Sequence, residues 1–204
     1  MSTTLSPVSP PTRVGAALLV AIVVWAAAVT WLAARGALLQ LVGLEYAILV
    51  AAGIAAPTLL YFLASPVRSW VESVGLYPLT LLHVWRVPAA LLFFWFGFRG
   101  ELPPAFWIPA GVGDLLVGLY AMRLLARGGD RAFYWRFHIV GFADFVIAVG
   151  AGLAHTLIAD PRMAPVAALP LALVPLFGVG LSGASHLVSF DLLRRKADGR
   201  MTRG

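Results

Sequence analysis

Three charged residues lie inside long apolar stretches of this 204-residue chain. Arg86, Asp114 and Asp144 each fall near the middle of a stretch that is otherwise long and apolar enough to cross a bilayer. A charge at the centre of a bilayer costs at least about 2.5–3.5 kcal/mol, so such residues face protein or water and often mark a functional site. These three residues are therefore the first candidates for chemistry.

The three charges are predicted to lie at one depth in the membrane. Measured from the end that we predict to be cytoplasmic, Arg86 is roughly 12 Å deep, Asp144 roughly 16 Å and Asp114 roughly 18 Å. We therefore expect the side chains to meet. Two carboxylates and one guanidinium leave one negative charge in excess, which a proton, a cation or a further donor would balance. We predict a site for a proton, a cation or a polar ligand, with an ion network that merely ties helices together as the alternative.

Both aspartates lie in a similar Gly-x-x-Asp-x-x-x-small pattern. Gly111 and Gly118 flank Asp114, while Gly141 and Ala148 flank Asp144. Residues three or four positions away share a helix face, and small residues let membrane helices approach closely. The pattern predicts small-residue faces that allow the two helices to pack against each other around the acids.

Histidines form a second group of candidates. His83 lies one turn before Arg86, and His138 and His186 also lie in the half of the membrane predicted to face the cytoplasm. Two histidines from different helices could ligate a b-type haem, and three could hold a metal ion. We expect no cofactor on the sequence alone, because no ligand spacing supports one, and keep b-haem as the alternative.

The last apolar stretch is interrupted by proline and glycine and carries a polar stripe. Pro170, Pro175 and several glycines precede Ser182 and Ser185. A proline frees a backbone carbonyl, and such breaks persist in membranes where they line a cavity or are satisfied by protein. Ser182 and Ser185 are therefore candidates for lining a cavity.

The composition predicts an all-α, polytopic transmembrane helical bundle. The chain is 61% hydrophobic and 12% charged, has no cysteine, and has a mean hydropathy of +0.90. Helices satisfy the backbone inside lipid, and β-barrel dyads are missing. The six predicted spans cover residues 14–34, 43–65, 78–98, 104–126, 133–156 and 165–193.

The loops predict the orientation. With a cytoplasmic N-terminus, eleven Lys and Arg residues fall inside and three outside, which favours both termini in the cytoplasm. We expect a disordered segment over 1–13, an amphipathic interfacial helix over 66–75 and a basic tail over 194–204. The expected location is the bacterial cytoplasmic (inner) membrane.

One segment resembles a known group. The run Gly100–Gly118, with its pattern LPxxFxxPAGxGDxxxG, is similar to a group of small bacterial multi-pass membrane proteins without an assigned function. The likeness covers about residues 80–195 and includes Trp85-Arg86, Gly141–Asp144 and Leu173–His186. The resemblance implies a fold and a membrane location, and no activity. The chain departs from the group at His83, which counts against a role that requires this residue.

The sequence leaves three functional hypotheses. The first is a small carrier or channel-like protein for protons, cations or a small polar solute, using Arg86, Asp114 and Asp144. The second is a redox-associated subunit that binds b-haem or a metal through the histidines, and the third is an accessory or assembly protein without chemistry. No enzyme motif is present, so we expect no catalytic residues. The expected partners are the lipid bilayer and either a homo-oligomer or another membrane protein, with no nucleic acid.

Overall fold

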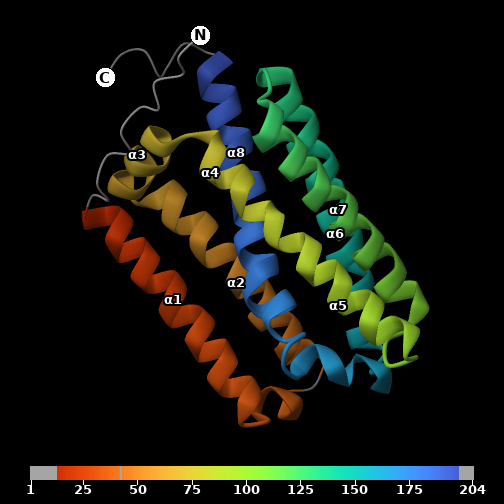
Figure 1. Ribbon diagram of the computed structural model, residues 1–204. Coiled ribbons are helices and arrows are strands. Elements are labelled where there is room, and N and C mark those ends of the chain that lie inside the picture. Colours follow the sequence, from red (N-terminus) through yellow and green to blue (C-terminus); the bar gives the residue numbers. More distant parts are fainter. Residues whose placement is uncertain (1–12, 42, 198–204) are drawn as a thin grey trace.

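The computed structural model describes residues 13–41 and 43–197, and this part of the chain is entirely helical (Figure 1). The α-helices are α1 (Arg13–Ala34), α2 (Leu44–Leu63), α3 (Ser65–Val74), α4 (Leu76–Leu81), α5 (Arg86–Phe98), α6 (Pro104–Arg127), α7 (Arg131–Leu157) and α8 (Val179–Ala197). Three 3₁₀ segments, η1 (Ala37–Gln40), η2 (Leu82–Trp85) and η3 (Pro161–Ala167), and one π-helix, η4 (Val174–Gly178), complete the described elements.

Six helices in the described part of the chain are long and apolar enough to cross a membrane, which confirms the predicted fold class. Four of the spans are single helices, α1, α2, α6 and α7. The third span joins α4, η2 and α5 over Leu76–Phe98, and the sixth joins η4 and α8 over Val174–Arg195. The predicted disordered segment 1–13 and basic tail 194–204 lie largely outside the described residues.

Successive spans run in opposite directions, so the start of α1 and the end of α8 lie at the same end of the bundle (Figure 1). That end also carries α3 and the turn between α6 and α7, and we call it the α3 end. The opposite end carries η1, η3 and the turn between α5 and α6, and we call it the η3 end. An even number of spans requires this arrangement of the two termini.

The spans differ in burial, and the difference follows their composition. The sixth span, with its serines and glycines, is the most buried, whereas α1 and α2 are the least buried. In α1, the side chains of Leu19, Val20, Val23 and Val24 are all exposed. A continuous apolar face of this kind is stable against lipid and not against water, so the bundle implies a bilayer around it.

The short helix α3 matches the predicted amphipathic helix at 66–75. Pro66 lies in its first turn, where a missing N–H is harmless. Val71 is buried in a cluster with Tyr61 of α2 and with Val188 and Leu192 of α8. The apolar face of α3 therefore covers the end of the bundle.

The third and sixth spans are irregular, for the same physical reason. Pro88 cannot donate to the carbonyl of Val84, and the chain before it tightens into the 3₁₀ segment η2. The predicted start of the sixth span at residue 165 was wrong. Residues 165–173 form the end of η3 and a turn, because Pro165 and Pro170 interrupt regular helix, and the span begins at Val174.

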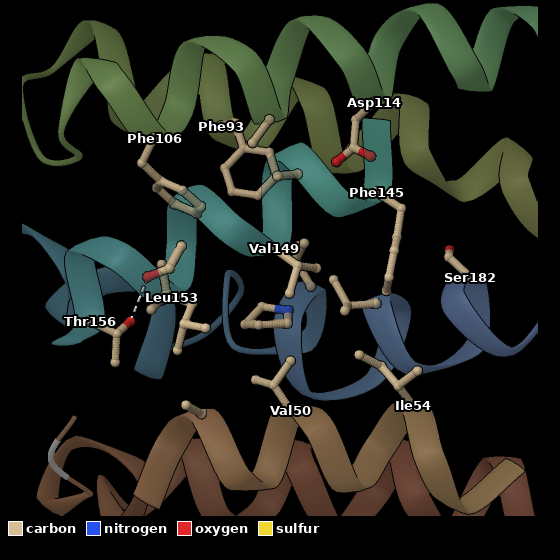
Figure 2. A pocket seen from close by; sticks show the side chains of 18 of the residues that line it. Val50, Ile54, Phe93, Phe106, Asp114, Phe145, Val149, Leu153, Thr156 and Ser182 are labelled. Atoms are coloured by element: carbon tan, nitrogen blue, oxygen red, sulfur yellow. Dashed lines mark hydrogen bonds between the residues drawn. The ribbon is translucent and has the colours of Figure 1, made fainter. Parts of the chain in front are cut away.

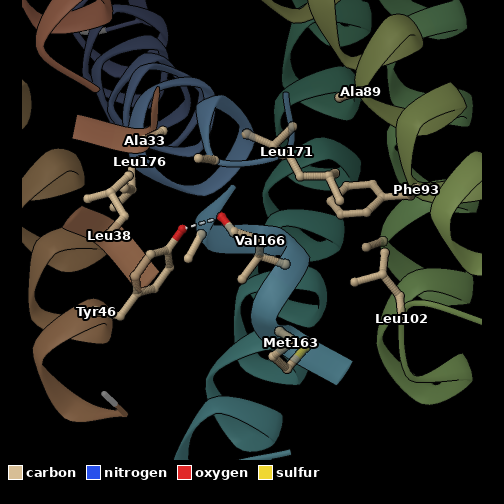
Figure 3. Packing of buried hydrophobic residues seen from close by; sticks show 14 of the residues in the cluster. Ala33, Leu38, Tyr46, Ala89, Phe93, Leu102, Met163, Val166, Leu171 and Leu176 are labelled. Carbon is tan, nitrogen blue, oxygen red and sulfur yellow. Dashed lines mark hydrogen bonds between the residues drawn. The ribbon is translucent and has the colours of Figure 1, made fainter. Parts of the chain in front are cut away.

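A buried apolar cluster closes the η3 end of the bundle (Figure 3). Met163 and Val166 from η3 pack there with Phe93 of α5 and Leu171 of the following turn. The hydroxyl of Tyr46 on α2 donates a hydrogen bond of 2.6 Å to the carbonyl oxygen of Val166. This bond ties α2 to η3.

Candidate functional site

The three charges predicted to meet do so. Arg86 is the first residue of α5, and the 3₁₀ turn before it directs its side chain between α6 and α7. The Nε atom of Arg86 donates to Oδ1 of Asp114 at 2.5 Å, and its Nη2 forms an ion pair with Oδ2 of Asp144. Its Nη1 lies 3.5 Å from the carbonyl oxygen of Gly141. The guanidinium therefore links three spans in one network.

The network is buried and carries one negative charge in excess among its three members. Arg86 is 3% exposed and Asp114 is 7% exposed, while the side chain of Asp144 is 14% exposed. Removing charges from water is costly, and the cost is recovered only when each charge has good partners. The geometry satisfies the guanidinium, whereas the second carboxylate leaves the negative charge for a proton or a cation to balance.

Gly113 makes the network possible, and the sequence pattern did not predict its role. A Cβ atom built at this position would overlap the carboxylate of Asp144. The residue immediately before Asp114 points about 100° around the helix from it, so Gly113 faces α7 while Asp114 faces Arg86. The sequence does contain a sign of this contact, the second glycine of Gly-Val-Gly-Asp. A pattern of small residues three and four positions from Asp114 does not include it.

The small residues of the two motifs lie at contacts with three neighbouring helices. A Cβ atom at Gly111 would lie 2.7 Å from Phe94 of α5, and one at Gly118 would lie 2.6 Å from Val87 of α5. Gly141 adjoins α8 and α6, since a Cβ atom there would lie 2.5 Å from the imidazole Cε1 of His186 and 3.2 Å from Val117. Ala148 packs against the apolar cluster at the η3 end. These small residues let α6 approach α5, and α7 approach α8.

A cavity of about 190 Å³ extends from the network toward the η3 end (Figure 2). Asp114 and Ser182 lie at one end and Thr156 at the other. Arg86 also borders the cavity, which is otherwise almost wholly apolar. The remaining walls include Tyr46, Val50 and Ile54 of α2, Phe93 of α5, Phe106 of α6, Phe145, Val149 and Leu153 of α7, and Val166 of η3.

Of the two serines predicted to line a cavity, only Ser182 borders this one. Its Oγ accepts a hydrogen bond of 3.1 Å from Nε1 of Trp85, the residue before Arg86. The Trp85 ring packs against Gly178, where a Cβ atom would overlap it. Trp85 thus connects the π-helix η4 with the network, and π-helical turns are frequent at functional sites. Ser185, which was also predicted to line a cavity, does not border this one and instead forms a hydrogen bond with a histidine.

The structure brings all three candidate histidines together. His83 of η2, His138 of α7 and His186 of α8 are fully buried, and one ring nitrogen from each lies within 4.8 Å of the others. Nδ1 of His138 lies 3.0 Å from Nδ1 of His186, and Nε2 of His83 lies 2.8 Å from Oγ of Ser185. We call these three residues the histidine cluster.

A b-type haem does not fit the histidine cluster. The ring centroids of His83 and His186 are 4.2 Å apart, and those of His138 and His186 are 5.2 Å apart. Axial histidines must leave room for a porphyrin between them, whereas these rings contact one another. The cavity borders the Arg86 network, and no histidine lines it. The geometry therefore gives no support to the haem hypothesis.

Comparison with known proteins identifies a protein family for this chain. No curated protein and no solved structure matches the chain. A family model described as a domain of unknown function (DUF8737) matches residues 43–194. The match includes every member of the Arg86 network and of the histidine cluster, and nearly all of the region 80–195 discussed above. Because the model covers most of the sequence, the chain belongs to this family of multi-helix proteins, the domain of unknown function DUF8737.

Proposed function

We propose that this protein is a small carrier for cations, which binds a proton or a protonated amine with a compact apolar body at Asp114 and Asp144. One observation carries the proposal. An almost wholly apolar cavity ends on Arg86 and on the carboxylate of Asp114, and the same guanidinium also pairs with Asp144. Ligand sites of this kind are mostly apolar and contain a few polar groups that fix orientation.

The charge of the network sets the class of solute. A neutral or anionic solute would gain nothing from the negative charge in excess, whereas an ammonium group or a proton would balance it. The cavity of about 190 Å³ is somewhat larger than the roughly 150 Å³ apolar cavity known to bind benzene. A cation with a body of about that size is therefore the expected ligand.

The broken sixth span supplies the part expected to move. The π-helix η4 borders the cavity through Val174 and Pro175, and Trp85, the residue before Arg86, packs against Gly178 of η4. Discontinuous helices beside a site near the centre of the membrane are typical of carriers. We propose that release toward the η3 end requires a rearrangement of this segment.

The proposed orientation places the α3 end in the cytoplasm of a bacterial cell. The excess of Lys and Arg in the loops at that end supports it. Because the chain has no cysteine, Ser73→Cys in α3 and Ala105→Cys in α6 can be labelled singly. In intact cells, an impermeant maleimide should label Ala105→Cys and leave Ser73→Cys unlabelled until the cells are permeabilised. The reverse pattern would invert the orientation.

The function is tested by flux into proteoliposomes. We expect the protein to carry benzylammonium down a gradient, or protons reported by an enclosed pH dye, and to leave the neutral analogue benzyl alcohol unaffected. Asp114→Asn and Asp144→Asn should abolish the flux. Glu101→Gln, which alters a carboxylate paired with Arg99 in the turn between α5 and α6, is the matched control.

Two results would overturn the proposal. One is wild-type protein that moves neither probe faster than empty liposomes. The other is flux that persists unchanged in both aspartate variants. Loss of folded protein in both variants, together with an inactive wild type, would favour the accessory or assembly hypothesis, in which the network only holds the helices together.

A further inference from the structure

The histidine cluster is not used by the proposed carrier, and its ring nitrogens are incompletely satisfied. Nδ1 of His83, Nε2 of His138 and Nε2 of His186 are buried and have no hydrogen-bond partner among the described residues. Buried polar atoms are normally paired, so three adjoining rings with incomplete hydrogen bonding are a candidate binding site. Oγ of Ser189, one turn beyond His186, is a fourth.

We propose that His83, His138 and His186 bind one d¹⁰ transition-metal ion, Zn²⁺ or Cu⁺, at a resident site distinct from the cation site. The required closeness exists already, since one ring nitrogen from each histidine lies within 4.8 Å of the others. In a tetrahedral site with Zn–N bonds of about 2.0–2.1 Å, such nitrogens are about 3.3 Å apart. Small rotations of the three rings would therefore complete the set of ligands.

The hydrogen bonding of the histidine cluster also favours a metal. In the contact between Nδ1 of His138 and Nδ1 of His186, one ring donates and the other accepts. A metal ion that replaces this hydrogen bond takes the Nδ1 lone pair of each ring, and the proton of each neutral ring then lies on Nε2. No open cavity is needed, because the ion occupies the space between nitrogens that now contact each other.

The ligand set selects the ion. Imidazole nitrogen suits zinc and copper, whereas Mg²⁺ and Ca²⁺ require several oxygen ligands that this cluster does not offer. Both Zn²⁺ and Cu⁺ are d¹⁰ ions without a preferred geometry, so three imidazoles suffice, with a water molecule at the fourth position. The hydroxyl of Ser185 already contacts His83 and so fixes the orientation of that ring.

The histidine cluster adjoins the Arg86 network at Gly141. Gly141 lies between the two groups, since its carbonyl oxygen faces Nη1 of Arg86 and its Cα faces the ring of His186. An ion here would also join η2, α7 and α8 at the centre of the bundle.

Metal binding can be measured on the full chain in nanodiscs, without a polyhistidine tag. The protein is stripped with a chelator and then equilibrated with Zn²⁺, with Co²⁺ as a spectroscopic substitute for Zn²⁺, or with Cu⁺ under reducing conditions. We expect one equivalent of metal per chain by mass spectrometry, intense visible bands for tetrahedral Co²⁺, and a higher unfolding temperature. Because the chain has four histidines and no cysteine, no thiolate competes for the ion.

Variants assign the ligands. We expect His138→Ala and His186→Ala each to lose the bound metal and the Co²⁺ bands. His155→Ala should keep both, because His155 lies outside the cluster and bonds to the carbonyl of Ala151. Competition between Zn²⁺ and Cu⁺ identifies the preferred ion. Wild-type protein that retains no stoichiometric metal would overturn the proposal, as would folded His138→Ala protein that binds as well as the wild type. None of these readouts depends on solute flux.

Discussion

Two polar groups adjoin each other in the centre of the bundle, and they differ in charge, in hydrogen bonding and in access to the cavity. The Arg86 network carries charge, satisfies its guanidinium with carboxylates from two helices, and borders a cavity. The histidine cluster carries no fixed charge, leaves one nitrogen of each ring without a partner, and borders no part of that cavity. A site that exchanges a solute needs access and spare charge, whereas a site that retains an ion needs closed ligands with free lone pairs.

The largest expected effect is the removal of the only cation in the Arg86 network. Arg86→Gln leaves Asp114 and Asp144 facing each other in a buried environment, and breaking a buried ion pair on one side costs about 3–5 kcal/mol. We expect a loss of that size in the free energy of unfolding, measured by SDS titration in mixed micelles. A loss below about 1 kcal/mol would show that the network is not the main polar link between these helices.

A change at Gly113 tests how closely α6 and α7 must approach. Gly113→Ala places a Cβ atom where the carboxylate of Asp144 lies. Overpacking of this kind costs about 1–3 kcal/mol, and we also expect the ion pair between Arg86 and Asp144 to be disturbed. Unfolding of the two variants Gly113→Ala and Gly150→Ala should be compared. At Gly150 a Cβ atom meets nothing within 4 Å, so the control should be as stable as the wild type.

Two serines one turn apart separate the roles of the two groups. Ser182→Ala removes the acceptor of the Trp85 indole at the cavity, and Ser185→Ala removes the partner of His83. Each variant should lose about 1 kcal/mol in the free energy of unfolding, the usual net contribution of one hydrogen bond. We expect Ser182→Ala to weaken cation binding several-fold and leave metal binding intact, and Ser185→Ala to do the reverse. Equal effects of both substitutions on the binding of both ligands would contradict the assignment of two separate sites.

The smallest effect is expected from an ion pair of equal length on the surface. Nε of Arg99 lies 2.5 Å from Oε1 of Glu101, the same distance as between Arg86 and Asp114. The side chain of Arg99 is 58% exposed, however, and solvated pairs contribute about 0–1 kcal/mol. Arg99→Gln should therefore shift the SDS midpoint far less than Arg86→Gln. Similar shifts would mean that burial does not set the strength of the network.

The sequence was sufficient for the spans and for the meeting of the charges, because both follow from the properties of the bilayer. Apolar length gives the helices, and the cost of an unpaired charge in lipid requires Arg86, Asp114 and Asp144 to find one another. The contact between His83, His138 and His186 could not be predicted, because it depends on how three separate helices rotate about their axes. No local spacing records these rotations.

The helix contacts at the glycines were harder to predict from the sequence than the pairing of the buried charges. Gly111, Gly118 and Gly141 mark close approaches, but a glycine does not identify its neighbour. Gly111 and Gly118 face α5, and Gly141 faces α8 as well as α6. Gly113 was passed over because its contact is made by the side chain of Asp144, which the sequence of α6 does not contain. Prolines broke the third and sixth spans as their chemistry requires, although the length of helix lost before Val174 was not foreseen.

Binding of benzylammonium to the wild type and two variants in nanodiscs, measured by calorimetric titration, tests the division of roles most directly. We expect the wild type and metal-free His138→Ala to bind the amine with similar affinity, and Asp114→Asn to lose the heat of binding. Folded His138→Ala protein that no longer binds, or Asp114→Asn protein that binds as tightly as the wild type, would contradict the assignment of the cation to the Arg86 network.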